Sequence, residues 1–175
     1  SKKKESIHSA PAIMMVMTQK DLKNLAINDL SEALSYIPGV SNTYNRFGVS
    51  TLKFRELGLD LSNIKSLLLL NSHPTWEPVL GNYELNSIPI DIIKKIEVIR
   101  GPGSVLYGTN AFLGVINILT MTGKELDGST ISYKTGGHGL NELRFSYGNY
   151  FDPIDVVVAG TVFDSKGEAY DVHSD

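Results

Sequence analysis

The hydrophobic pattern of the chain changes character at Gly123, and this change limits the fold more than any other feature. Before Gly123, short apolar runs alternate with segments of helical period, which favours an α/β or α+β sheet domain. After it no helical period appears, and apolar and polar residues alternate along three segments separated by turns. We therefore expect two parts, residues 1–123 and residues 124–175.

In the first part, the predicted strands share short apolar runs bounded by turn residues, and they cover 13–17, 49–54, 65–70, 96–99 and 115–120. Between them, residues 40–63 are mixed and rich in loop residues, and residues 71–86 form a long loop. One or two helical turns are expected across 91–93, because Ser87 and Pro89 precede them.

Two helices are predicted near the start of the chain. Thr18 and Asp21 have the spacing of a capping box, which predicts a helix over about 19–25. Asn28 is the expected cap of a second helix, which Pro38-Gly39 should end. The apolar residues of this second helix fall at i, i+3, i+4 and i+7, and they are Leu30, Ala33, Leu34 and Ile37.

The second part contains two amphipathic strands and a third apolar one. Ile131 and Tyr133 alternate with polar residues, and so do Leu143, Phe145 and Tyr147, while residues 156–163 form the third strand. Outer-membrane β-barrels have this pattern, because one face meets lipid and the other a polar lumen. An ordinary antiparallel sheet with one solvated face has it as well, so the pattern alone leaves both open.

Composition and motifs argue against several kinds of function. The net charge of −3 is unlike that of a general nucleic-acid binder, and the absence of cysteine excludes disulfides, thiolate metal sites and a cysteine nucleophile. The glycine-rich stretch at 100–109 lacks the lysine that a phosphate-binding loop requires. The four histidines do not have metal-ligand spacing. We expect no enzyme, no bound metal and no intrinsic cofactor.

The loop at 71–86 is a candidate recognition surface, because it carries His73, Trp76, Glu77 and Tyr83. An equally good interpretation is that Trp76 packs against the core and that the other three side chains are solvated.

The sequence IEVIRGPGSVLYG at 96–108, followed by GVINILT at 114–120, resembles the plug domain of TonB-dependent outer-membrane receptors. Further matches in the family's order lie at 10–12, 30–40, 67–74 and 87–89, so the resemblance covers about residues 7 to 123.

The resemblance implies an α+β plug domain with a mixed four-stranded sheet and short helices, which lies inside a barrel of about 22 strands. In that family the plug closes the pore, and ferric siderophores, haem or cobalamin bind its outward loops. The energy-transducing protein TonB pulls an N-terminal TonB box. The resemblance therefore implies a transporter in the outer membrane of a Gram-negative bacterium, with residues 124–175 forming the first barrel strands. Two alternatives remain, a receptor for a protein ligand without transport and a soluble sheet protein.

The same resemblance implies roles for individual residues. Arg55 and Arg100 match two plug arginines that contact the barrel, although Glu56 follows Arg55 where the family has glycine. Residues of the structural motif are Gly101, Pro102, Gly108 and Gly114. The outward loops correspond to 43–48 and 71–83, and the ligand-contact residues expected there are Tyr44, Arg46, Phe47, His73, Trp76 and Tyr83. Asn71-Ser72 stands where the family has a glycine-containing turn.

The expected partners are TonB, through a TonB box outside this chain, the protein's own barrel and a small metal chelate. No nucleic acid is expected. Three strands cannot close a barrel, so we expect the chain to be a fragment. Strand edges left unpaired at 128–163 predict that the fragment dimerises by strand pairing there.

Overall fold

The computed structural model describes residues 13–44, 50–54, 66–75, 85–100, 107, 111 and 113–166. The chain divides into two compact units, residues 1–120 and residues 121–175. This division lies between Thr120 and Met121, whereas the hydrophobic pattern placed the boundary after Gly123. The difference arises because Gly123 donates its N–H to Asp155, a residue of the second unit.

A five-stranded mixed sheet forms the first unit, in the order β1-β6-β7-β4-β5. The strands are β1 (Ile13–Thr18), β6 (Ile93–Arg100), β7 (Gly114–Thr120), β4 (Ser66–Leu70) and β5 (His73–Pro74). Only the β4–β7 pair is parallel, and the other pairs are antiparallel. The mixed sheet that the family resemblance implied is confirmed. It contains four of the five strands predicted for the first part, together with the two-residue β5, while the predicted strand at 49–54 lies outside it.

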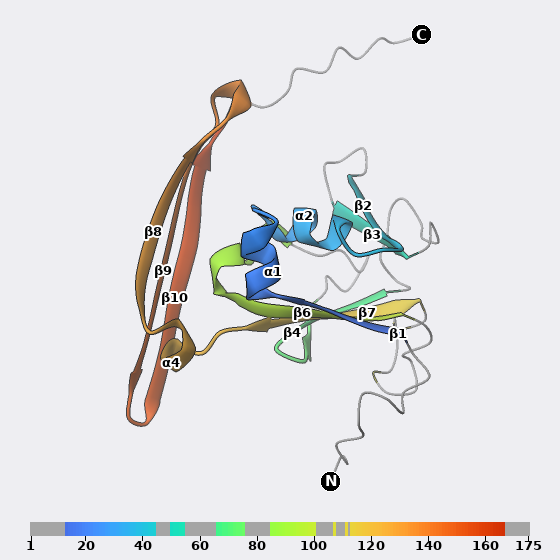
Figure 1. Ribbon diagram of the computed structural model, residues 1–175, viewed down its shortest axis with the longest axis horizontal. Helices are drawn as coiled ribbons and strands as arrows, with labels where there is room; N and C mark the ends of the chain where they lie inside the picture. Colours follow the sequence, from blue (N-terminus) through green and yellow to red (C-terminus); the bar gives the residue numbers. More distant parts are fainter. Residues whose placement is uncertain are drawn as a thin grey trace. The chain divides into compact units, whose positions relative to one another are not determined.

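Two short helices, α1 (Gln19–Asn24) and α2 (Leu30–Ser35), cover one face of this sheet (Figure 1). The capping box of α1 is confirmed, because the Thr18 side chain accepts from the Asp21 N–H and the Asp21 carboxylate accepts from the Thr18 N–H. The cap predicted for α2 is wrong. Asp29, not Asn28, accepts the Glu32 N–H at 2.7 Å, and Asn28 instead donates to the Glu32 carboxylate.

The main core lies between these helices and the sheet. The predicted apolar face of α2 is confirmed, because Leu30, Ala33, Leu34 and Ile37 are at most 1% exposed. Residues of the sheet that join this core include Leu68, Ile96, Val98, Ile116 and Ile118. A smaller apolar cluster contains Leu67, Leu69, Ile99, Ala111 and Val115. The period of two along each strand separates the two sets, which lie on opposite faces of the sheet.

A separate hairpin joins β2 (Val40–Tyr44) and β3 (Ser50–Phe54) in antiparallel register. The second strand was predicted, but the first falls in a segment interpreted as irregular because of its asparagines. Pairing with β3 outweighs the weak strand propensity of residues 40–44. The 3₁₀ turn η3 (Ile90–Ile92) precedes β6 and agrees with the helical turn expected near 91–93. A second 3₁₀ turn, η2 (Leu85–Ser87), was not predicted and begins within the segment interpreted as a long loop.

The second unit is a three-stranded antiparallel sheet in the order β10-β9-β8, seen as the long curved ribbon in Figure 1. Its strands are β8 (Gly128–Thr135), β9 (Asn141–Phe151) and β10 (Ile154–Asp164), with the 3₁₀ turn η4 (Gly137–Gly139) between the first two. A short helix, α4 (Gly123–Leu126), was not predicted. Four residues are too few to display a helical period, although Thr122 and Glu125 do form its capping box.

The faces of this second sheet differ in character. Register places Ile131 beside Phe145 and Tyr133 beside Leu143, so these side chains share one apolar face. That face is open in the described chain, where Ile131 is 76% exposed and Val162 65%. The opposite face carries the ion pair of Arg144 with Glu142, at 2.9 Å between Nε and Oε1.

Candidate functional site: the braced turn between β4 and β5

The sequence-predicted site residues fall into two groups, those that the structure places in a strand and those outside the described part of the chain. Tyr44 ends β2, His73 begins β5, Arg100 ends β6 and Gly114 begins β7. The residues that lie outside the described part of the chain are Arg46, Phe47, Arg55, Trp76, Tyr83, Gly101, Pro102 and Gly108. Side-chain geometry therefore bears on His73 and Arg100.

His73 follows a two-residue hairpin turn at Asn71-Ser72. Leu70 pairs with His73 across it, and both turn residues have positive φ, 49° at Asn71 and 67° at Ser72. This left-handed pair of conformations matches the twist of a tight hairpin. Asparagine tolerates the left-handed region, whereas serine adopts it rarely. The turn therefore requires stabilisation from outside itself.

The Asn71 side chain ties the turn to the end of β7. Its Oδ1 accepts from the Thr120 N–H at 3.0 Å, and its Nδ2 donates to the Thr120 Oγ1 at 3.0 Å. The Asn71 N–H also donates to the Ile118 carbonyl at 2.8 Å. One asparagine thereby continues the sheet contacts of β4 beyond its last residue.

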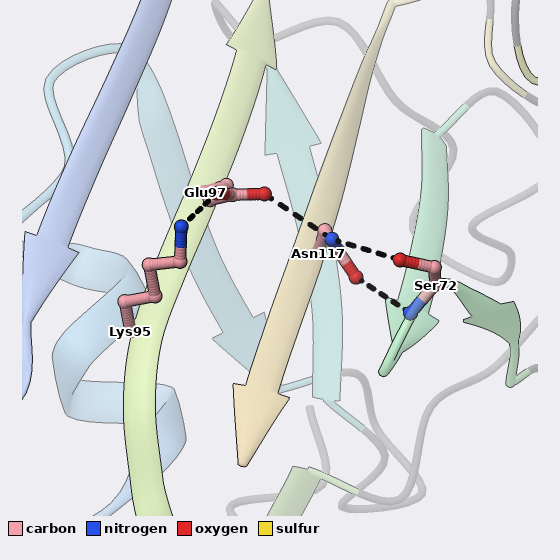
Figure 2. A network of polar contacts seen from close by, with 4 residues as sticks. All are labelled: Ser72, Lys95, Glu97 and Asn117. Atoms are coloured by element: carbon pink, nitrogen blue, oxygen red, sulfur yellow. Dashed lines mark hydrogen bonds and ion pairs between the residues drawn. The ribbon is translucent and has the colours of Figure 1, made fainter. Parts of the chain in front are cut away.

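A second set of bonds centres on Asn117, a polar residue within the apolar run 115–119 of β7 (Figure 2). Its Oδ1 accepts from the Ser72 N–H at 3.0 Å, and its Nδ2 donates to Glu97 Oε2 at 3.2 Å. Lys95 approaches the other oxygen of Glu97 at 2.6 Å. We call Ser72, Lys95, Glu97 and Asn117 the brace. Because Asn117 is only 9% exposed, these bonds satisfy an amide that would be costly to bury alone.

The brace leaves the His73 side chain exposed. Its Nδ1 lies 2.9 Å from the Asn71 carbonyl oxygen, and since a carbonyl can only accept, Nδ1 is the donor. The neutral imidazole then has its lone pair on Nε2. The turn therefore presents an oriented imidazole that can accept a hydrogen bond or coordinate a metal chelate.

Arg100 lies at the other end of the sheet, where it pairs with Ile13 and Gly114. Thr120 is six residues along β7 from Gly114, which is about 20 Å of strand. His73 and Arg100 are therefore not brought together. The Arg100 Nε is buried, and no described residue accepts a hydrogen bond from it. A buried guanidinium N–H without an acceptor is unusual in a folded protein.

Sequence analysis did not identify the four residues of the brace as a functional group. Asn117 had a signal, because it interrupts the apolar run at 115–119. The sequence gives no comparable signal for Glu97, and the structure shows Asn117 and Lys95 as the partners of its carboxylate. The described segments hold no group of three or more residues suited to a metal ion. None of the described helices is long and apolar enough to span a membrane.

Known proteins resemble this chain over most of its length. A family model described as the TonB-dependent receptor plug domain matches residues 6–115. The vitamin B12 transporter BtuB of Vibrio vulnificus is 30% identical over 75% of this chain and 21% of that protein. The iron-regulated outer membrane virulence protein of Vibrio cholerae is 35% identical over 65% of this chain and 18% of that protein. The chain thus spans about a fifth of the length of these relatives.

Solved structures show the same fold. The siderophore receptor PirA of Acinetobacter baumannii has a TM-score of 0.64 at 24% identity, over 91% of this chain and 25% of that one. A complex of FpvAI with pyocin S2 has a TM-score of 0.71 at 12% identity, over 91% of this chain and 21% of that one. Both matches extend beyond the first unit, because either covers more of the chain than residues 1–120 contain.

Proposed function

The chain belongs to the family of TonB-dependent receptor plug domains, and from this premise we propose that it gates an outer-membrane transporter for a metal chelate. In this proposal the first unit, residues 1–120, forms the plug, and β8, β9 and β10 of the second unit form the first strands of the surrounding barrel. The relatives named as transporters or receptors fit a protein that is not an enzyme.

The observation that carries the proposal is the open apolar face of the second unit. The strands β9 and β10 have eleven residues each. At about 3.3 Å per residue and a tilt near 40°, such a strand spans about 27 Å of membrane, close to the apolar band of an outer-membrane barrel. Water would penalise the exposure of Ile131, Tyr133 and Val162, whereas lipid would not. The ion pair on the opposite face suits a polar lumen.

We propose that the cargo is an iron siderophore, haem or a similar metal chelate. The relatives support this class, since one is a vitamin B12 transporter and another a siderophore receptor. His73 is the contact residue with the best structural support, because its imidazole is exposed and its turn is held by Asn71 and Asn117. The other proposed contacts are Tyr44, Arg46, Phe47, Trp76 and Tyr83.

We further propose that Arg100 contacts an acidic residue of the barrel. Its buried Nε has no acceptor in the described part of the chain, and a carboxylate from outside the unit would supply one. Arg55 is proposed for the same role by its match to the family. Replacing Arg100 by lysine should weaken this contact, because lysine cannot reproduce the fork of a guanidinium.

Energised uptake is the direct test. The protein that carries this chain is expressed in a Gram-negative strain that lacks its own transporters of this class. Radiolabelled cyanocobalamin, ferric enterobactin and haem are then supplied separately. We expect uptake of one of them to depend on TonB, and His73→Ala to reduce it while His138→Ala, a matched exposed histidine of the second unit, does not. Absence of TonB-dependent uptake of every chelate would refute the transport function.

The alternative is a receptor for a protein ligand without transport. One structural neighbour, FpvAI, was solved in complex with pyocin S2, which is a reason to test protein ligands beside chelates. Saturable binding of a protein together with no chelate uptake would favour this alternative.

The outer edges of β8 and β10 pair with no other strand in the described part of the chain, and they support one further proposal, that the chain studied alone pairs strands with a second copy through residues 128–163. Light scattering of the chain with and without residues 124–175 tests it. A dimer is expected only when those residues are present, and a monomer in both cases would contradict pairing.

A further inference from the structure

One peptide unit connects the His73 imidazole to the brace. This unit consists of the Asn71 carbonyl and the Ser72 N–H. Its N–H donates to Asn117 Oδ1 at 3.0 Å, and its carbonyl oxygen accepts from His73 Nδ1 at 2.9 Å. Because a peptide unit is planar and rigid, the bond to Asn117 fixes the direction of the carbonyl to which the His73 ring donates.

The series of hydrogen bonds continues beyond Asn117 to a charged group (Figure 2). Asn117 Nδ2 donates to Glu97 Oε2 at 3.2 Å, and Lys95 Nζ donates to Glu97 Oε1 at 2.6 Å. Each donor from the imidazole onwards therefore points towards the carboxylate, through the peptide unit and then the Asn117 amide. We call this series, from His73 to Glu97, the relay. Bonds in such a series strengthen one another, because each polarises the next.

The Glu97 carboxylate sets the direction of the relay. An ionised carboxylate only accepts hydrogen bonds, so it holds the NH₂ group of Asn117 on its own side and leaves Oδ1 for the Ser72 N–H. A reversed amide would place an oxygen against the carboxylate and an NH₂ group against the N–H. Because Asn117 is only 9% exposed, such a mismatch would be costly.

We propose that Glu97 is a positioning residue for the cargo contact at His73, although it lies on β6, with β7 between it and the turn. This inference rests on the proposed function, in which the imidazole contacts a metal chelate. Histidines that bind metals generally donate their other ring N–H to a carboxylate or a carbonyl, which fixes the tautomer and makes the ligating nitrogen more basic. In this protein the carboxylate acts through an amide and a peptide unit, and the lone pair stays on Nε2.

Two variants distinguish the relay from a merely structural role. Glu97→Gln keeps the size of the side chain. The Lys95 ammonium can only donate, so it binds the glutamine oxygen and leaves the glutamine NH₂ group facing the Asn117 NH₂ group. The Ser72 N–H then loses its acceptor. The double variant Lys95→Met with Glu97→Gln releases the glutamine oxygen for Asn117 and should restore the relay, although it removes one more native bond.

The first readout is the tautomer of His73, which does not depend on the cargo. Histidine labelled with ¹⁵N in the ring is incorporated into the intact protein in detergent micelles, and His73→Ala identifies the NMR signals of that ring. In mildly alkaline buffer, where histidine rings are neutral, the parent should carry its proton on Nδ1.

Glu97→Gln should lower the ratio of the Nδ1–H to the Nε2–H tautomer about fivefold, which corresponds to one ordinary hydrogen bond. The double variant should recover at least half of this change. The matched control is Glu142→Gln in the second unit, where the carboxylate is paired with Arg144. This control should leave the His73 ratio unchanged.

The second readout is TonB-dependent uptake of radiolabelled cyanocobalamin, ferric enterobactin and haem. For the chelate that is transported, Glu97→Gln should raise the half-saturation concentration about fivefold at an unchanged maximal rate, and the double variant should reverse this. A merely structural role would instead lower the maximal rate, because less folded protein would reach the membrane.

Three results would overturn the proposal. They are an unchanged tautomer ratio in Glu97→Gln, a double variant no closer to the parent than Glu97→Gln, and a ratio that responds while the half-saturation concentration stays constant. If the parent takes up no chelate, the transport function fails, and the tautomer ratio alone then decides whether the relay exists.

Discussion

The brace predicts a large effect for one small substitution, Asn117→Asp. The change replaces Nδ2, which donates to Glu97 Oε2 at 3.2 Å, by an oxygen of a second carboxylate. Two effects then add. A hydrogen bond to a charged group, worth about 1.5–3 kcal/mol, is lost. Two negative charges at this separation repel by about 5 kcal/mol at an effective dielectric constant of about 20.

Part of this repulsion is relieved. Lys95 stays paired with Glu97, and the Glu97 side chain, 24% exposed, can move towards water. We therefore expect Asn117→Asp to lower the free energy of unfolding of the first unit by about 3 kcal/mol at neutral pH. Because the carboxylates repel only in the folded chain, the folded state binds a proton more tightly than the unfolded state. The decrease in the free energy of unfolding caused by Asn117→Asp should therefore be small in acid and should grow as pH rises.

Urea unfolding followed by tryptophan fluorescence measures this effect, since Trp76 is the chain's single tryptophan and belongs to the first unit. The second variant is the exchanged pair Glu97→Gln with Asn117→Asp, in which a glutamine amide again faces a carboxylate. This pair should recover at least half of the lost free energy, while Glu97→Gln alone should cost under about 1 kcal/mol. A single variant within about 0.5 kcal/mol of the parent, or an exchanged pair no better than Asn117→Asp, would refute the role of the brace.

Three further predictions concern the turn, α4 and the first helix. Ser72→Gly should raise the free energy of unfolding of the first unit by about 1 kcal/mol, because glycine adopts φ = 67° without strain, and a lowered urea midpoint would contradict this. Gly148→Ala should displace α4 at a cost of about 1–3 kcal/mol, seen as faster amide exchange at 123–126, whereas Gly137→Ala, which meets no atom within 4 Å, should leave it unchanged. Hydrogen bonds from the Thr18 hydroxyl and N–H lower the pKa of Asp21, so its stabilising effect is complete above the ordinary pKa and is lost as pH falls through the lowered value. Asp21→Asn should therefore flatten the acid side of the stability profile, and an unchanged profile would exclude this contribution.

Local signals predicted the elements of the first unit because each depends on neighbours in sequence. The apolar face of α2, with Leu30 and Leu34, needs only the helical period, and the cap at Thr18 needs only Asp21. The strand at 40–44 and the brace depend on partners far along the chain. Asn117 and Ser72 are 45 residues apart, and no local pattern connects them. Prediction therefore failed where a residue's environment is set by sheet pairing.

The brace, together with the bonds of the Asn71 side chain, also explains how a serine can occupy the second position of this turn. The left-handed conformation of Ser72 costs roughly 1–2 kcal/mol relative to glycine, which adopts that region without steric strain. The Ser72 N–H donates to Asn117 Oδ1, and the Asn71 side chain makes two bonds to Thr120, each worth about 1 kcal/mol. The stabilisation from these three hydrogen bonds is therefore larger than the conformational strain at Ser72. Since the same bonds hold the last residues of β7, the turn that presents His73 is tied to the end of that strand. A substitution that weakens the brace should consequently disturb both the orientation of the His73 imidazole and the end of β7.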